Sequence, residues 1–298
     1  MKRVSCLQVL GALVFLISAR AIACPMCMYA RELTISAQEL VYAERSVVAM
    51  PVADRNEFRI VAVIKGDAPP DNTITGKVFR ADAPEMQSKK PLLLIRDHDW
   101  GQWVNFGPVN ADQADWLRHL SATKRTIGMT DSEWREHVAY FLPYLEKPEP
   151  MVAEIAFNEF MDAPYGALRS LKPHLDVAAI RTWLNDPKLA KRQPVYLLLL
   201  GIAGTSQDAA WLERRMAATR KTHDTTNLTA LIGADLELRG SAGVEQIEKM
   251  YLTDSTRTKP EIEAALVALK VHGDTDSPAS RDALNRYLAS HARSVSLK

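Results

Sequence analysis

The hydrophobic pattern of this chain changes its period near residue 112. Before that point apolar and polar residues alternate, most clearly where Phe58, Ile60 and Ile64 alternate with Glu57 and Arg59. A period of two is typical of strands, so we expect strands at residues 46–52, 58–64, 73–80, 91–96 and 103–106. Five short strands joined by turns predict a small antiparallel barrel or sandwich.

One short helix is expected ahead of these strands, at residues 36–42. Ser36 stands at its start with Glu39 three residues later, the spacing of a capping box.

After residue 112 the apolar positions recur with a period of 3.6, which predicts helices to the end of the chain. Pro150 and Pro260 lie where first-turn prolines are favoured, and Thr130 precedes another helix. The expected helices cover residues 112–123, 131–146, 149–162, 176–185, 190–203, 206–220, 226–239, 242–253, 260–272 and 279–291.

Three glycines recur with nearly equal spacing in this helical half. Gly204, Gly240 and Gly273 lie 36 and 33 residues apart, each after the last apolar residues of a helix, where a left-handed cap favours glycine. Each unit of about 35 residues is a helical hairpin whose apolar face needs a neighbour. Over residues 130–292 these units resemble HEAT-type repeats, which implies an α-solenoid. The predicted fold class is therefore α+β, a barrel-like domain followed by an all-α hairpin array.

The amino terminus has the features of a secretory signal peptide. Lys2 and Arg3 precede an apolar run at residues 9–17, and small residues follow at Ala21 and Ala23. The run is far shorter than the roughly 20 residues that span a bilayer. We therefore expect a signal peptide at 1–23, a β-rich domain at 24–111 and a helical domain at 112–298. The mature chain would begin at Cys24 and be periplasmic or extracellular, without a transmembrane span.

Composition and charge exclude several classes of protein. The chain is 47% hydrophobic and 24% charged, as expected of a globular protein rather than a disordered one. It holds 37 Lys and Arg against 36 Asp and Glu, and loss of the three basic residues in 1–23 leaves 34 against 36. This near balance argues against nucleic-acid binding.

The most distinctive motif is Cys24-Pro25-Met26-Cys27-Met28, which holds both cysteines of the expected mature chain. In an oxidising compartment a Cys24–Cys27 disulfide is the first interpretation. A thiol-redox role is a second, although no strand precedes the motif as in thioredoxin-like sites. The two thiolates with the thioethers of Met26 and Met28 would also suit Cu(I). Lipid attachment at Cys24 is a further alternative, and haem attachment is excluded because Met28 stands where it requires His.

The front half, residues 24–108, resembles the netrin-like modules found in tissue inhibitors of metalloproteinases and related secreted proteins. The residues that carry the resemblance are the starting Cys24, the strand ending Val63-Ile64-Lys65-Gly66, and Leu92-Leu93-Leu94-Ile95 followed by Trp100 and Trp103. The resemblance implies a five-stranded OB-type barrel. It does not extend to protease inhibition, because the distant cysteines that pair with the N-terminal ones in that family are missing. The complete layout also resembles uncharacterised bacterial envelope proteins.

Asp97-His98-Asp99 follows an expected strand and is a second candidate site, for a metal ion or a general base. The alternative is a polar turn, because no other His or Cys has matching spacing. Zinc-protease, P-loop and nucleophile-elbow motifs are incomplete or missing. The expected function is therefore an exported protein-interaction or structural module without catalysis and without a cofactor. A thiol-redox or copper-handling protein is the alternative.

Overall fold

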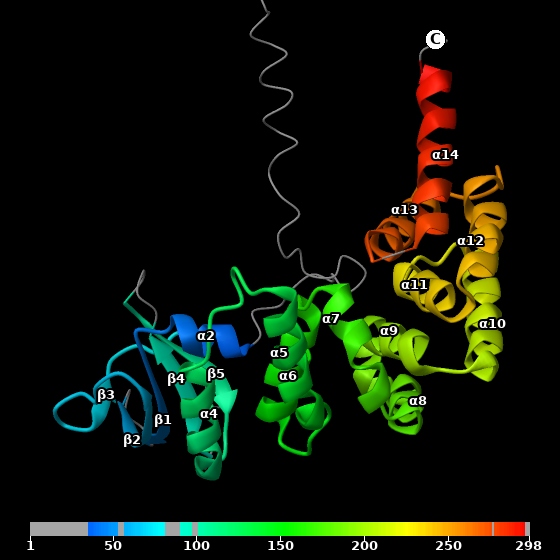
Figure 1. Cartoon of the computed structure of the whole chain (residues 1–298). Coiled ribbons are helices and arrows are strands. Elements are labelled where there is room, and N and C mark those ends of the chain that lie inside the picture. Colours follow the sequence, from blue (N-terminus) through cyan, green and yellow to red (C-terminus); the bar gives the residue numbers. More distant parts are fainter. Residues whose placement is uncertain (1–34, 53–56, 81–89, 97–100, 276, 296–298) are drawn as a thin grey trace, which may run out of the picture.

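The structure is a computed structural model that describes residues 35–52, 57–80, 90–96, 101–275 and 277–295, with side chains described to residue 290. In the described part of the chain, one short helix and a five-stranded antiparallel sheet come first, and helices follow the sheet (Figure 1). The strands are β1 (Arg45–Val52), β2 (Glu57–Lys65), β3 (Thr73–Thr75), β4 (Leu92–Arg96) and β5 (Trp103–Pro108). Their order in the sheet is β3-β2-β1-β4-β5.

Both faces of the sheet are apolar, which explains the uninterrupted leucines of β4. Leu93 and Ile95 face the cluster that contains the helices, while Leu92 and Leu94 face a second cluster within the sheet domain. Because successive side chains point to opposite faces, a strand buried on both sides reads as a continuous apolar run. β4 thus lies between two layers of apolar packing.

The strand expected at residues 73–80 is shorter than predicted. β3 ends at Thr75, and Gly76 follows with a φ of 99°, a conformation that favours glycine. The chain then reaches the opposite edge of the sheet, where Phe79 forms one parallel bridge with Val104 of β5. The five strands form an open sheet, and a closed barrel is not part of the observed pairing.

Helix α2 (Ala37–Tyr42) precedes the sheet, as predicted, but it is not capped as predicted. The Ser36 side chain makes no capping hydrogen bond in the described part of the chain. Instead the amide of Ala37 donates to Oε1 of Glu159, 122 residues away, at 2.7 Å. The local capping-box prediction was wrong because a buried carboxylate from a distant helix supplies the acceptor.

The helical half agrees closely with the periodicity. Thr130 forms a capping box with Glu133, and Pro150 and Pro260 lie in first turns, as expected. Helix α7 was not predicted, and helix α12 continues into a π-helical turn at Glu248–Leu252. The helices are α4 (Ala114–Ser121), α5 (Asp131–Phe141), α6 (Pro150–Asp162), α7 (Tyr165–Ser170), α8 (Val177–Asn185), α9 (Gln193–Ala203), α10 (Ser206–Thr222), α11 (Leu228–Arg239), α12 (Ser241–Ile247), α13 (Lys259–Asp274) and α14 (Pro278–Val295). Short 3-10 turns lie at Ala111–Gln113, Leu142–Tyr144, Lys172–His174 and Pro187–Arg192.

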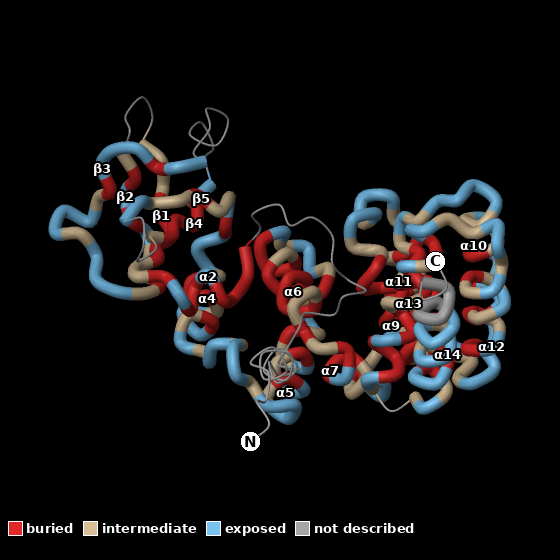
Figure 2. The backbone as a smooth tube through the Cα atoms, turned by 90° about the horizontal axis from the view of Figure 1, so that it is seen from above, coloured by how far each residue is buried: buried red, intermediate tan, exposed pale blue. Residues whose placement is uncertain are grey.

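Helices α9, α11 and α13 pack in a row, with α11 between the other two. Figure 2 shows this row buried along most of its length, while exposed positions gather on α10 and α14. At the α9–α11 crossing, a Cβ on Gly201 would lie 2.5 Å from Cα of Ala234, so only glycine fits.

The three periodic glycines do not share the left-handed conformation that we expected. Only Gly240 has a positive φ, 58°, whereas Gly204 is extended and Gly273 lies inside α13. At Gly204 and Gly273 an added Cβ would collide with Leu200 and Arg281, respectively. Close packing, rather than backbone handedness, accounts for two of the three glycines.

One apolar cluster continues across the expected domain boundary at residue 111. It runs from α2 and the inner face of the sheet through α4, α5 and α6 to α13. The boundary itself stays a prediction. No helix in the described part of the chain combines the length and apolarity that crossing a membrane needs.

Candidate functional site

The residues singled out by the sequence lie outside the described part of the chain. This applies to Cys24, Met26, Cys27 and Met28, and equally to Asp97, His98 and Asp99. Among the described residues, no three His, Cys, Asp or Glu side chains gather as metal ligands would. The disulfide, copper, lipid-anchor and general-base hypotheses therefore remain predictions.

One buried cluster resembles a catalytic triad in composition but lacks the access that a triad needs. His272 Nδ1 lies 2.9 Å from Ser280 Oγ, and His272 Nε2 lies 3.6 Å from Oε2 of Glu237. Ser280 is fully buried and also bonds to Ser277, so no substrate reaches its hydroxyl. A nucleophile must be exposed to its substrate. The cluster instead joins α11, α13 and the start of α14.

A second carboxylate cluster has a comparable structural role. Glu261 is 1% exposed and accepts hydrogen bonds from the amide and hydroxyl of Thr258, which it caps at the start of α13. Burial by itself would raise the pKa of Glu261, but the hydrogen bonds from His223 and Thr258 and the charge of Arg257 lower it to about 2. The strong shift reflects a saturated helix cap rather than a reactive acid.

Two surface recesses of the helical half lie on the two sides of the short helix α8. Asp176 caps α8 by accepting hydrogen bonds from the amides of Ala178 and Ala179. Only Ile180 and Leu184 of the helix are buried, so most of α8 faces outwards. A helix turn places residues three or four apart on one face, and this spacing directs one set of α8 side chains to each recess.

The first recess, which we call the apolar groove, has a volume of about 570 Å³. Trp183 forms one wall, and its ring lies 5.0 Å from the ring of Tyr196. Tyr196 is itself fixed by a hydrogen bond to Glu146, which also pairs with Arg192. The lining residues are Ala139, Leu142, Pro143, Leu145, His174, Asp176, Ala179 and Trp183.

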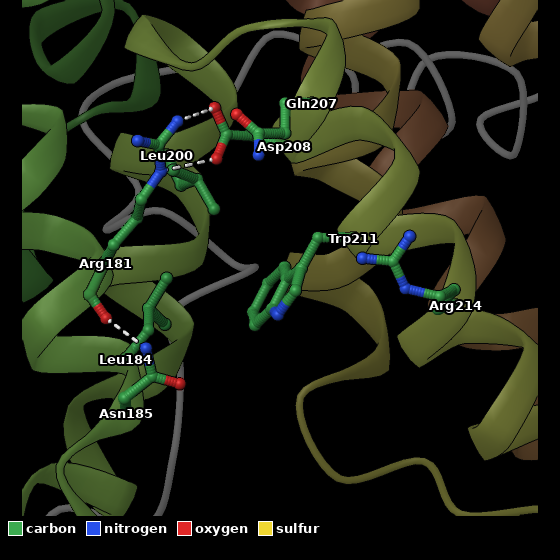
Figure 3. Close-up of a pocket in the computed structure, with 8 residues that line it drawn as sticks. All are labelled: Arg181, Leu184, Asn185, Leu200, Gln207, Asp208, Trp211 and Arg214. Carbon is green, nitrogen blue, oxygen red and sulfur yellow. Dashed lines mark hydrogen bonds and ion pairs between the residues drawn. The ribbon is translucent and has the colours of Figure 1, made fainter.

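The second recess, which we call the Trp211 pocket, has a volume of about 230 Å³ and lies between α8 and α10. Figure 3 shows the Trp211 indole projecting from α10 towards Leu184 and Asn185 of α8. The guanidinium of Arg215 lies 4.9 Å from the centre of the Trp211 ring, so a cation stacks on one face. The remaining lining residues are Arg181, Leu200, Gln207, Asp208 and Arg214.

An ion pair forms one end of the Trp211 pocket. Arg181 donates from Nε and from one terminal nitrogen to the two oxygens of Asp208, both at 2.8 Å (Figure 3). Asp208 also accepts from the amide and hydroxyl of Thr205, as the cap of α10. The hydrogen bonds from Arg181, with those from Thr205, hold the pKa of Asp208 below its usual value although burial opposes the shift. The only acid of the pocket is thus already neutralised.

Sequence reasoning did not identify these recesses. Arg214 is exposed on α10, like an ordinary arginine on the solvent-facing side of a helix. Trp183 and Trp211 had no assigned role, although a half-buried tryptophan next to arginines is a common feature of binding surfaces. The tryptophans and arginines can be seen in the sequence. That α8 and α10 lie next to each other can be seen only in the structure.

Comparisons of the chain with protein-family models, with curated proteins and with solved structures find no match.

Proposed function

We propose that the sheet closes into an OB-type barrel of the netrin-like kind and that the helices form a HEAT-like solenoid. The strand order β3-β2-β1-β4-β5 supports the first part, because an OB barrel closes when the segment after β3 lies parallel to β5. The parallel bridge between Phe79 and Val104 lies at that place. The row of α9, α11 and α13 with helices outside it supports the second part.

The proposed function is that of an exported protein-interaction module without catalysis, which binds a partner protein across α8. The observation that carries it is the pair of recesses on either side of one exposed helix. Half-buried Trp183 and Trp211 form their walls, and rigid aromatic residues in recesses commonly supply most of the energy of an interface. A partner that straddles α8 would insert side chains into both recesses.

Site-specific photocrosslinking in the native host tests this function. A benzoylphenylalanine residue replaces Ala179 beside the apolar groove, or Gln207 beside the Trp211 pocket. Lys259, which is 87% exposed at the start of α13, serves as the control position. We expect one discrete heavier species from positions 179 and 207 and none from 259. Equal labelling at all three positions, or none at the α8 positions, would refute binding across α8.

The alternative, a thiol-redox or copper-handling protein acting through Cys24 and Cys27, depends on the sequence motif alone. Intact mass of the exported product reports its first residue, any acyl chain on Cys24 and the oxidation state of the pair. Thiol titration and competition for Cu(I) complete the test. A locked disulfide with no copper uptake would eliminate the alternative and leave the interaction module.

A further inference from the structure

The Trp211 pocket combines an apolar wall with unneutralised positive charge. Arg181 forms an ion pair with Asp208. Arg214 is exposed and has no hydrogen-bond or ion-pair partner among the described residues. Figure 3 shows the Arg214 guanidinium directed back towards Trp211. Arg215, which is not itself a lining residue, adds a second cation on the Trp211 ring, and the only carboxylate among the described lining residues is that of Asp208, which is paired with Arg181. A recess of this charge favours an anionic group.

Polar atoms for orienting such a group are also present. Asn185 donates from Nδ2 to the carbonyl of Arg181 at 2.8 Å, which fixes its amide at the wall. The exposed Gln207 amide makes no hydrogen bond within the described residues and can donate to a ligand. A guanidinium together with an amide donor is a common arrangement for binding a carboxylate.

The volume and the apolar lining of the Trp211 pocket limit the kind of ligand that fits it. A volume of about 230 Å³ lies below the range of about 300–1,000 Å³ for cofactor and drug-sized ligands. It suits one or two amino-acid side chains. Leu184 and Leu200 are buried beneath the recess, and Trp211 offers ring surface beside them. The aliphatic part of a Glu side chain or a neighbouring apolar residue would contact this surface.

We propose that the Trp211 pocket binds an acidic side chain of an extended peptide segment in the partner, with the carboxylate on Arg214 and an adjacent apolar residue on Trp211. This inference rests on the proposed function, since the same segment would continue across α8 into the apolar groove. The groove carries the apolar part of the recognition, and the Trp211 pocket selects for negative charge.

Fluorescence polarisation with labelled peptide pools tests this specificity on the complete chain. In the first decapeptide pool, Asp or Glu alternates with Leu, Ile, Val or Phe. A second pool replaces the acids with Lys or Arg, and a third replaces the apolar positions with Ser or Gly. We expect binding of the first pool, with the second and third at least about tenfold weaker, which corresponds to about 1.4 kcal/mol.

Variants then assign the binding to the pocket. Arg214→Glu is expected to lower the affinity for the first pool by about tenfold or more, and Trp211→Ala should lower it by a similar factor. Lys221→Glu makes the same charge change on the same helix outside the pocket and should change affinity less than about twofold. Because Arg214 is exposed, the Arg214→Glu variant should have the same unfolding free energy as the parent chain. The Arg214→Glu result therefore decides the test even if the Trp211→Ala variant does not fold.

The outcomes separate this inference from the proposed function. Equal binding of the basic pool, no binding of the acidic pool, or no effect of Arg214→Glu would each overturn the acidic-peptide specificity. If crosslinking at position 179 persists in these cases, binding across α8 survives and only the specificity fails. If the crosslink is also lost, both proposals fail.

Discussion

Glu159 is the buried acidic side chain on which the attachment of α2 depends. Its side chain is fully buried, and its two oxygens accept from the Ala37 amide and contact His137 Nε2, each at 2.7 Å. The neighbouring Asn158 donates to the Ile35 carbonyl at 2.6 Å, so α6 holds both sides of the start of α2. The two contacts with Ile35 and Ala37 join residues that are more than 120 positions apart in the sequence.

Replacing Glu159 with Ala should destabilise the protein strongly. Glu159→Ala removes the hydrogen-bond partner of two buried groups, the Ala37 amide and the His137 ring nitrogen, and each unsatisfied buried group costs about 1–3 kcal/mol. Both losses come from the same side chain and are not fully additive, so we expect a total loss of about 2–5 kcal/mol. Glu159→Gln keeps an acceptor for the Ala37 amide and should cost about 1–2 kcal/mol.

Urea denaturation of the parent and variants measures these changes, and hydrogen exchange locates them. The amides of α2 are expected to lose protection in Glu159→Ala more than those of α11. Glu136→Gln, an exposed change on α5, is the matched control and should stay within about 0.5 kcal/mol. In a double-mutant cycle, His137→Ala with Glu159→Ala should cost less than the sum of the single changes. A loss below about 1 kcal/mol for Glu159→Ala would refute the role assigned to this carboxylate.

Two further predictions concern packing and pH. Gly201→Ala should destabilise the chain by about 1–3 kcal/mol in urea titrations, because its Cβ meets Ala234. Gly166→Ala, with its nearest neighbour 4.0 Å away, should be neutral or stabilising by up to about 1 kcal/mol, and equal effects of the two changes would contradict the close crossing. Because the folded pKa of Glu261 is about 2, below its usual 4.5, the stability it adds is present above pH 4.5 and is lost as pH falls towards 2. Allowing for solvent screening, Glu261→Gln should remove about 1–2 kcal/mol of that pH-dependent stability, and an unchanged acid transition would refute it.

The candidate site shows where sequence reasoning stops. The cysteine motif and Asp97-His98-Asp99 are recognisable in the sequence because residues of reactive or metal-binding types lie close together. The Trp211 pocket instead combines α8 with α10, and its arginines are ordinary surface residues when read one by one. Only the tertiary structure places Arg181 and Arg214 in the lining of one recess with Trp211.

The local elements of this protein follow from its amino-acid sequence. Periods of two and 3.6 report which face of a segment is buried, and that property belongs to each segment alone. The change from strands to helices near residue 112 and most helix bounds follow from it. The Thr130 cap follows equally, because all its partners lie within one turn.

Tertiary structure alone decided the contacts between segments far apart in the chain. The cap of α2 comes from Glu159, and the glycine at 201 is required by Ala234 of α11. The continuous core across residue 111 likewise depends on which faces meet. The periodicity of a segment indicates that its apolar face is buried. Which other segment covers that face depends on the packing of the complete chain.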